Sequence, residues 1–112
     1  MIIAWTTTET RAEAERLARG AVEARLAVCA QIDGPITSFF PWEGKFDSAE
    51  EYRIWFKCLP PNASALNIWV HTHHSYLVPQ WIEVSAEAVG EKYLSWAIAN
   101  STPAPFPAQK ST

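Results

Sequence analysis

Cysteine and glycine are both scarce in this sequence. The only two cysteines among the 112 residues are Cys29 and Cys58, and two thiols do not make the disulfide framework that supports small secreted domains. The chain has four glycines, and it contains no Gly-rich loop of the kind that binds phosphate groups. The fold must therefore depend on an ordinary hydrophobic core, and a nucleotide-phosphate loop is excluded.

Long apolar runs and basic clusters are also missing. No apolar segment approaches the roughly 18 residues that a membrane-spanning helix needs. Nine Lys and Arg against twelve Asp and Glu give a formal net charge of −3, without the basic patch of a nucleic-acid-binding protein. The first residues lack the basic region and cleavage site of a signal peptide. We therefore expect a soluble, cytoplasmic protein that binds neither nucleic acid nor membranes.

Aromatic side chains, by contrast, are abundant. Six Trp, five Phe and three Tyr make up 12% of the chain. A domain of this size buries only about two-thirds of its unfolded surface on folding. Part of the aromatic surface is therefore expected to be covered by another copy of the protein, although an aromatic-rich core in a monomer would account for the same composition.

The spacing of apolar residues predicts four strands and three helices. The strands are expected at residues 2–7, 26–40, 51–59 and 78–86, and the helices at residues 10–25, 60–73 and 90–100. Thr10 and Glu13 have the spacing of a capping box at the start of the first helix, and Gly20 inside that helix indicates either close packing or a weak point. Gly34 and Pro35 interrupt the second strand, which predicts a bend at a β-bulge.

This β-α-β-β-α-β order with a short terminal helix is the ferredoxin-like pattern, an α+β fold whose antiparallel sheet carries both main helices on one face. We expect a single domain over residues 1–100 and a flexible, Pro-rich tail over residues 101–112. The other face of the sheet is left bare. Because Arg53, Trp55 and Lys57 alternate with core residues in the third strand, that face is expected to be partly aromatic and to need a partner.

Histidine and cysteine are the residues that could bind a metal ion. All three histidines, His71, His73 and His74, fall at the predicted end of the second helix, and imidazole is a common ligand of zinc and copper. Cys29 offers a soft thiolate. The alternative is that the histidines only complement the helix dipole and that Cys29 is a small buried side chain, as we infer for Cys58.

Catalytic motifs are missing. No nucleophile stands in a recognisable arrangement with a base, and the G-x-S-x-G motif is absent. Glu43, Glu50 and Glu51 could act as acids, but glutamates near a hairpin turn are usually solvated. We therefore predict that the protein is not an enzyme and has no organic cofactor.

Four segments, in the same order along the chain, resemble motifs of the CutA family of divalent-cation tolerance proteins. Residues 23–32 resemble the segment E-x-R-L-A-A-C-V-N-I, and residues 37–45 resemble a hairpin that contains S-x-Y-x-W-E-G-K. Residues 74–79 resemble H-P-Y-E-V-P, and residues 93–96 resemble Y-L-x-W. The resemblance runs from about Trp5 to Trp96.

The resemblance implies a ferredoxin-like subunit that assembles as a tight homotrimer, with the bent hairpin and the sheet edges joining neighbours. It also implies a cleft between subunits, formed by the family's Cys, Trp, Lys, His and Tyr positions. In this chain those residues are Cys29, Trp42, Lys57, His74 and Tyr76. The family is linked to tolerance of copper and other divalent metals, and its trimer is similar to the nitrogen-regulatory PII signalling proteins.

Two positions depart from the family's pattern. Leu77 stands where the H-P-Y-E-V-P motif has Glu, which removes an oxygen ligand. This loss either favours a soft metal such as Cu(I) or means that the site is weakened or lost. Ser75 replaces the Pro of the motif, whose ring would have fixed the backbone φ. His71 and His73 have no counterpart in the motif and are candidates to replace the lost ligand.

The first functional hypothesis is therefore a trimeric, metal-responsive protein. We expect it to bind copper or zinc through His74 and Cys29, aided by His71 or His73.

Two other hypotheses stay open. One is a PII-like regulatory module that binds a small anionic ligand between subunits, with Lys57 supplying charge and Trp42 and Tyr76 an apolar wall. The other is a trimeric scaffold for another protein.

Overall fold

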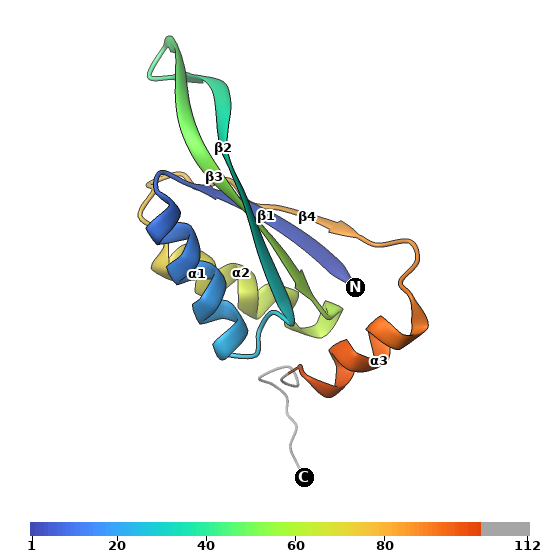
Figure 1. Cartoon of the computed structure of the whole chain (residues 1–112). Helices are drawn as coiled ribbons and strands as arrows, with labels where there is room; N and C mark the ends of the chain where they lie inside the picture. Colours follow the sequence, from blue (N-terminus) through green and yellow to red (C-terminus); the bar gives the residue numbers. More distant parts are fainter. Residues whose placement is uncertain (102–112) are drawn as a thin grey trace.

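Figure 1 shows the computed structural model of the chain, which describes residues 1–101. The elements in this range are β1 (Ile2–Thr8), α1 (Arg11–Glu23), β2 (Cys29–Trp42), β3 (Lys45–Cys58), the short 3-10 helix η1 (Pro60–Asn62), α2 (Ala63–His73), β4 (Ile82–Ser85) and α3 (Glu91–Ala99). None of these helices combines the length and the hydropathy that a membrane crossing requires. Apart from Ser101, the predicted tail lies outside the described residues.

The four strands form one antiparallel sheet in the order β2-β3-β1-β4. α1 and α2 pack on one face of this sheet, and α3 follows β4 at the end of the described chain (Figure 1). This is the α+β arrangement that the sequence predicts, so the predicted fold class is confirmed.

The core lies between the two helices and the sheet face that they cover. Alternate residues of β3 point into it, as the sequence pattern predicts: Ile54 and Phe56 are fully buried, and Cys58 is 1% exposed. Leu17 on α1 and Leu66 on α2 are buried against them. The two helices therefore share one continuous core with β1 and β3.

The ends and the packing of α1 follow from a few residues. The Thr10 side chain accepts a hydrogen bond from the backbone N–H of Glu13 at 3.2 Å, which confirms the predicted cap. The helix ends at Glu23, short of the predicted residue 25, where Arg25 has a left-handed backbone with φ of 62°. A Cβ at Gly20 would lie 2.7 Å from the ring of Trp69 on α2. Gly20 therefore marks close packing of the two helices.

β2 and β3 form a long hairpin that projects beyond the rest of the molecule (Figure 1). Their register shifts between Asp33 and Ile36, which confirms the predicted bulge. The turn residues Glu43 and Gly44 both have positive φ, 52° and 78°, as a two-residue hairpin turn requires. β3 begins at Lys45 rather than at residue 51 because the polar segment 45–50, which shows no apolar alternation, is held by pairing with β2.

β4 is shorter than the sequence pattern predicts. It covers Ile82–Ser85 rather than residues 78–86. Residues 76–81 form no regular structure, and Pro79 among them has no backbone N–H to donate to a strand. This irregular segment becomes one side of the groove described below.

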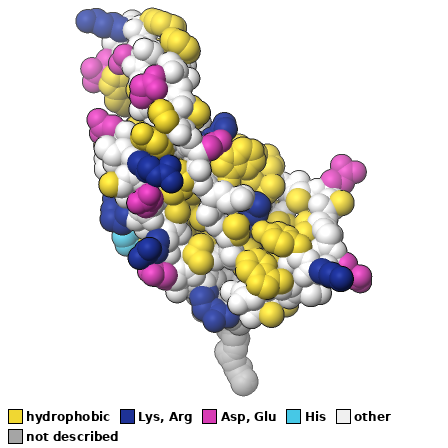
Figure 2. Space-filling view, viewed as in Figure 1, with side chains coloured by type: hydrophobic (Ala, Val, Ile, Leu, Met, Phe, Trp, Pro, Cys, Tyr) yellow, Lys and Arg dark blue, Asp and Glu magenta, His cyan; other side chains and the backbone are white. Residues whose placement is uncertain are grey.

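The sheet face that α1 and α2 leave uncovered is here called the outer sheet face. Trp5 and Trp55 meet edge to face on it, with ring centroids 5.0 Å apart. Ile82 and Val84 on β4 are 50% and 40% exposed beside β1. Figure 2 shows hydrophobic side chains gathered over β1 and β4 and over α3. The chain by itself thus leaves a partly aromatic face open to solvent.

Candidate functional site

His74 follows the last residue of α2, and its side chain has no solvent exposure. Its Nε2 donates a hydrogen bond to the carbonyl oxygen of Thr7 at 2.9 Å and lies 3.1 Å from the hydroxyl of Thr6. Its Nδ1 accepts a hydrogen bond from the backbone N–H of Tyr76 at 3.1 Å. Both ring nitrogens are thus occupied within the chain. In this structure the imidazole links the end of α2 to β1 and has no nitrogen free for a metal.

The carboxylate of Glu13 stands beside this imidazole, 3.7 Å from its Nδ1. Burial lowers the pKa of His74, and the Thr7 carbonyl and Glu13 oppose that effect only in part. Glu13 also accepts hydrogen bonds from the backbone N–H of Ser75 at 2.9 Å and from its hydroxyl at 2.7 Å. A proline at this position could donate neither bond. Ser75 therefore adds two hydrogen bonds to Glu13 but lacks the fixed backbone φ of proline.

The other two histidines are exposed on α2. Nδ1 of His71 is 2.9 Å from the carbonyl oxygen of Asn67, and Nδ1 of His73 is 2.8 Å from that of Trp69. Hydrogen bonds of this kind fix the tautomer in which Nε2 carries the free lone pair, the form that binds metals. The two rings pack against different partners, His71 against Trp81 and His73 against Trp69.

Cys29 lies on the opposite side of the sheet from His74. It pairs with Lys57 at the start of β2, and Lys57 Nζ is 5.7 Å from the ring centroid of Tyr93 on α3. Burial and the adjacent Cys29 raise the pKa of Tyr93. Lys57 belongs to the outer sheet face, whereas Thr6, which contacts His74, is buried on the helix-covered face. One chain therefore does not bring Cys29 and His74 together.

A metal centre within one chain is not formed by the described residues. Across residues 1–101, His, Cys, Asp and Glu side chains make no group of three or more that could hold a metal ion. The four predicted ligands Cys29, His71, His73 and His74 are spread over both sides of the sheet. Metal binding stays a prediction, and a site that used both Cys29 and a histidine would have to take them from different subunits.

An open groove of about 930 Å³ lies between the β2–β3 hairpin and residues 76–80. Trp42 and Tyr76 both line it, so the structure brings together two of the three residues predicted for a ligand cleft. Lys57, the third, lies six residues beyond Glu51 along β3, roughly 20 Å at about 3.3 Å per residue. Within one chain Lys57 does not reach the groove.

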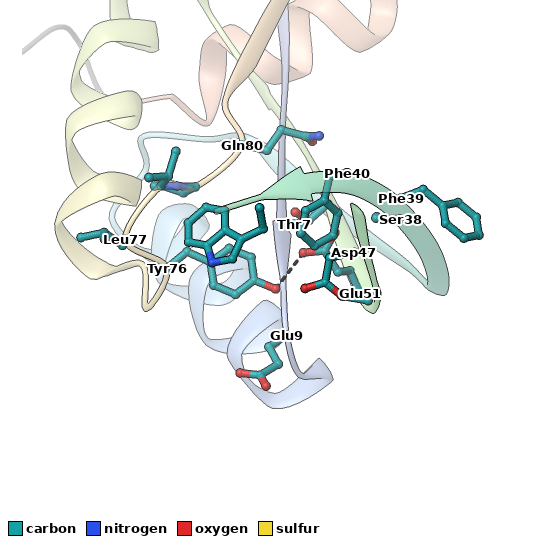
Figure 3. Close-up of a pocket in the computed structure, with 14 residues that line it drawn as sticks. Thr7, Glu9, Ser38, Phe39, Phe40, Asp47, Glu51, Tyr76, Leu77 and Gln80 are labelled. Atoms are coloured by element: carbon teal, nitrogen blue, oxygen red, sulfur yellow. Dashed lines mark hydrogen bonds between the residues drawn. The ribbon is translucent and has the colours of Figure 1, made fainter. Parts of the chain in front are cut away.

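The floor of the groove holds a hydrogen-bonded pair. Figure 3 shows the hydroxyl of Tyr76 directed at the carboxylate of Glu51, and the donor–acceptor distance is 2.7 Å. Glu51 is 7% exposed. Burial raises the pKa of Tyr76, and Glu51, Glu9 and Glu13 raise it further. The phenol therefore stays protonated and donates to the carboxylate.

The charge of the groove is negative. Its lining includes the carboxylates Glu9, Asp47 and Glu51 and, among the described residues, no Lys, Arg or His. A small anion would meet carboxylates and no counter-charge from the same chain. The groove of one chain therefore does not favour the anionic ligand that the PII-like hypothesis predicts.

Glu51 is the site residue that sequence reasoning misplaced. It was expected to be a solvated glutamate near a turn, but β3 extends past it and Tyr76 covers it. Strand alternation back from Trp55 and Arg53 does place Glu51 on the outer sheet face. That it is buried depends on the segment after α2, which no local pattern reveals.

The chain matches a family model described as "CutA1 divalent ion tolerance protein" over residues 2–100. It belongs to the CutA1 family. The family resemblance that the four motifs predict is therefore confirmed across nearly the whole of the described chain.

Two curated CutA1 relatives illustrate the similarity. "Protein CutA homolog" from Xenopus laevis is 35% identical over 83 residues, which is 74% of this chain and 55% of that protein. "Protein CutA, chloroplastic" from Arabidopsis thaliana is 33% identical over 101 residues, 90% of this chain and 55% of that protein. The chain thus spans about half the length of these two relatives.

A solved CutA1 structure shares the fold. CutA1 from Pyrococcus horikoshii is 28% identical, with a TM-score of 0.87 over 91% of this chain and 99% of that one. The overall fold of this chain is thus one seen in a solved CutA1 structure.

Proposed function

We propose that this CutA1-family chain is a non-enzymatic, cytoplasmic protein of divalent-cation tolerance that acts as a homotrimer and binds copper or zinc at clefts between subunits. The observation that carries the proposal is the match to a divalent ion tolerance family over residues 2–100. Assembly and metal uptake are separate parts of the proposal, and each has its own support and its own experiment.

Trimer formation is supported by the outer sheet face. Large apolar side chains stand open to solvent there: Ile82 is 50% exposed and Val84 40% exposed on β4. Phe46 near the hairpin tip is 79% exposed and stacks on Phe39. Exposed apolar surface of this extent is typical of a protein interface. A neighbouring subunit on the outer sheet face and around the hairpin would cover these side chains.

Substituting Val84→Glu is expected to dissociate the trimer without unfolding the subunit. The change puts one carboxylate per subunit into an apolar interface, and an uncompensated buried charge costs several kcal/mol. We expect the dissociation constant to rise by at least about 100-fold, measured by analytical ultracentrifugation across a dilution series. Ile68→Glu is the matched control, because Ile68 is a similarly exposed apolar residue, 65% exposed, on α2. A wild-type protein that sediments as a monomer would contradict the trimer.

Metal binding is supported by the chemistry of two kinds of residue. Cys29 is partly exposed on the outer sheet face, where a neighbouring subunit would pack. His71 and His73 each have Nδ1 tied to a backbone carbonyl, which orients Nε2 outward. A thiolate and an imidazole suit Cu(I) and Zn(II) better than hard cations. His74 is the weakest of the four predicted ligands, because both of its nitrogens are already bonded.

Native mass spectrometry of the reduced, chelator-stripped protein tests metal uptake directly. We expect one copper or zinc ion per subunit in the trimer, and uptake should be strongly reduced in Cys29→Ala. Cys58→Ala is the matched control: burial raises the pKa of Cys58 to about 11, which keeps it as a thiol that does not bind metal. A trimer that takes up no metal, or equal uptake by both variants, would overturn the assignment of Cys29.

A further inference from the structure

The last helix, α3 (Glu91–Ala99), lies against the cysteine that the proposed function assigns to a metal. We propose that α3 is a lid over Cys29, which moves away on the irregular segment before it and so admits a soft metal ion to the thiol. The inference rests on the proposed function for the identity of what enters. Closure of Cys29 by α3 is a property of a single chain, and it is tested without metal.

Tyr93 is the residue of α3 that closes over Cys29. Cys29 begins β2, an edge strand of the sheet, yet it is only partly exposed. The Tyr93 hydroxyl lies within hydrogen-bonding reach of its thiol. Lys57, the partner of Cys29 on β3, places its Nζ 5.7 Å from the ring centroid of Tyr93. A phenol ring held between these two side chains limits the approach of a reagent or an ion to the sulfur.

The inner face of α3 is small. Tyr93, Leu94 and Ala97 share this face by their helical spacing; Leu94 is half-buried and Ala97 is fully buried. On the rest of the helix, Trp96 and Ile98 are 45% and 59% exposed. A helix of nine residues is not stable by itself in water and depends on the face that it buries. Elements with so little buried surface are the ones that open locally while the core stays folded.

Both ends of α3 suit a part that moves. The segment 86–90, between β4 and α3, forms no regular structure, and Figure 1 shows α3 set apart from α1 and α2 at the end of this connection. A Cβ on Gly90 would meet nothing within 4 Å, so the segment is not packed there. Just beyond the other end, Ser101 accepts a hydrogen bond from the Asn62 side chain at 3.0 Å. Neutral hydrogen bonds of this kind contribute modest net free energy, so the lid opens without unfolding of the sheet.

Alkylation of the reduced, metal-free protein with iodoacetamide, followed by mass spectrometry, tests the lid. Tyr93→Ala is expected to raise the alkylation rate of Cys29 by about fivefold or more, because it removes the ring that covers the thiol. Tyr93→Phe is the matched control: it keeps the ring and should not accelerate the reaction. Cys58, 1% exposed in the core, should stay unmodified in all three proteins and reports that the fold is intact.

Three outcomes overturn the lid. The first is an equal alkylation rate in wild type and Tyr93→Ala, and the second is equal acceleration by Tyr93→Phe and Tyr93→Ala. The third is acceleration by Val84→Glu but not by Tyr93→Ala, which would make the neighbouring subunit the cover of Cys29. Metal uptake is measured separately: a wild-type protein that takes up no metal contradicts the proposed function, whereas the alkylation rates still decide on the lid.

A second pair of variants serves if Tyr93→Ala does not fold. Ala97→Asp puts a charge on the buried face of α3 and should displace the helix, which should accelerate alkylation of Cys29 as Tyr93→Ala does. Ser95→Asp is the matched control, because Ser95 is exposed on the same helix. In the wild-type protein, amide hydrogens of α3 should exchange at least about tenfold faster than those of α1. Equal protection of the two helices would overturn the proposal.

Discussion

Replacing Gly34 with alanine is expected to lower the free energy of unfolding by about 3 kcal/mol or more. Gly34 sits at the bulge of β2 with φ of 137°, a backbone conformation that side chains rarely allow. A Cβ there would lie 2.9 Å from the carbonyl oxygen of Glu51 and 3.1 Å from the Cα of Tyr52. Both contacts are with backbone of the neighbouring strand, which cannot move aside as a flexible side chain can.

The measurement for Gly34→Ala is urea denaturation at a fixed protein concentration, because stability of an oligomer depends on concentration. Gly44→Ala is the control: Gly44 also has positive φ, 78°, but a Cβ there meets nothing within 4 Å. It should cost only about 1 kcal/mol. Equal losses in the free energy of unfolding of the two variants would show that backbone strain alone destabilises them and that the close contact with the Glu51 backbone does not contribute. Gly34→Ala should also weaken the binding of any ligand that contacts Glu51.

Substituting His74→Ala is expected to destabilise the protein by about 2–4 kcal/mol at pH 7.5. The change removes a fully buried ring and leaves the Thr7 carbonyl and the Tyr76 N–H without their partner. Loss of metal binding in such a variant would therefore not identify His74 as a ligand. Stability to urea has to be measured alongside metal uptake.

The same residue makes stability depend on pH. Burial lowers the pKa of His74 in the folded chain below its ordinary value of about 6.5. Below that value the unfolded chain binds a proton that the folded chain excludes, so proton uptake favours unfolding. The contribution of His74 to stability is therefore complete above pH 6.5 and is lost as the pH falls through the pKa of the folded state. Wild-type protein should lose stability in this range.

Denaturation at several pH values between neutral and mildly acidic checks this expectation. His74→Gln, which cannot titrate, should be less stable than wild type at neutral pH and should lose less stability on acidification. His71→Gln is the matched control, because that ring is exposed on α2, and it should follow the wild-type profile. A His74→Gln protein with the wild-type pH dependence would assign the effect to groups other than His74.

Local patterns were sufficient for most of the fold. The cap at Thr10, the inward alternation of Ile54 and Phe56, and the bulge after Asp33 follow from short-range rules, and the structure has all of them. The largest errors concern the polar half of the hairpin and the start of β4; in addition, β2 begins at Cys29 rather than at residue 26, and α1 ends at Glu23 rather than at residue 25. In the first two of these places contacts with residues distant in the sequence decide the structure. The local sequence there shows no alternation of apolar and polar residues.

The candidate site shows the same division. The family resemblance implies a cleft between subunits to which Trp42 and Tyr76 contribute, and within one chain both line the groove. The burial of His74 depends on Thr6 and Thr7, which lie 68 and 67 residues away along the chain. No spacing within the cluster of histidines could have separated His74 from the exposed His71 and His73. Tertiary contacts alone make one histidine structural and leave the other two open.

The bulge in the hairpin has a mechanical consequence. One wall of the groove is the projecting arm of β2 and β3, while the other wall is fixed to the body of the molecule by His74. The bend near Gly34 therefore sets how far the walls stand apart. A partner that binds the β2–β3 hairpin, such as a neighbouring subunit, therefore changes the affinity of the groove for a molecule lying between those walls. By linkage, that molecule must change the free energy with which the partner binds the hairpin by the same amount.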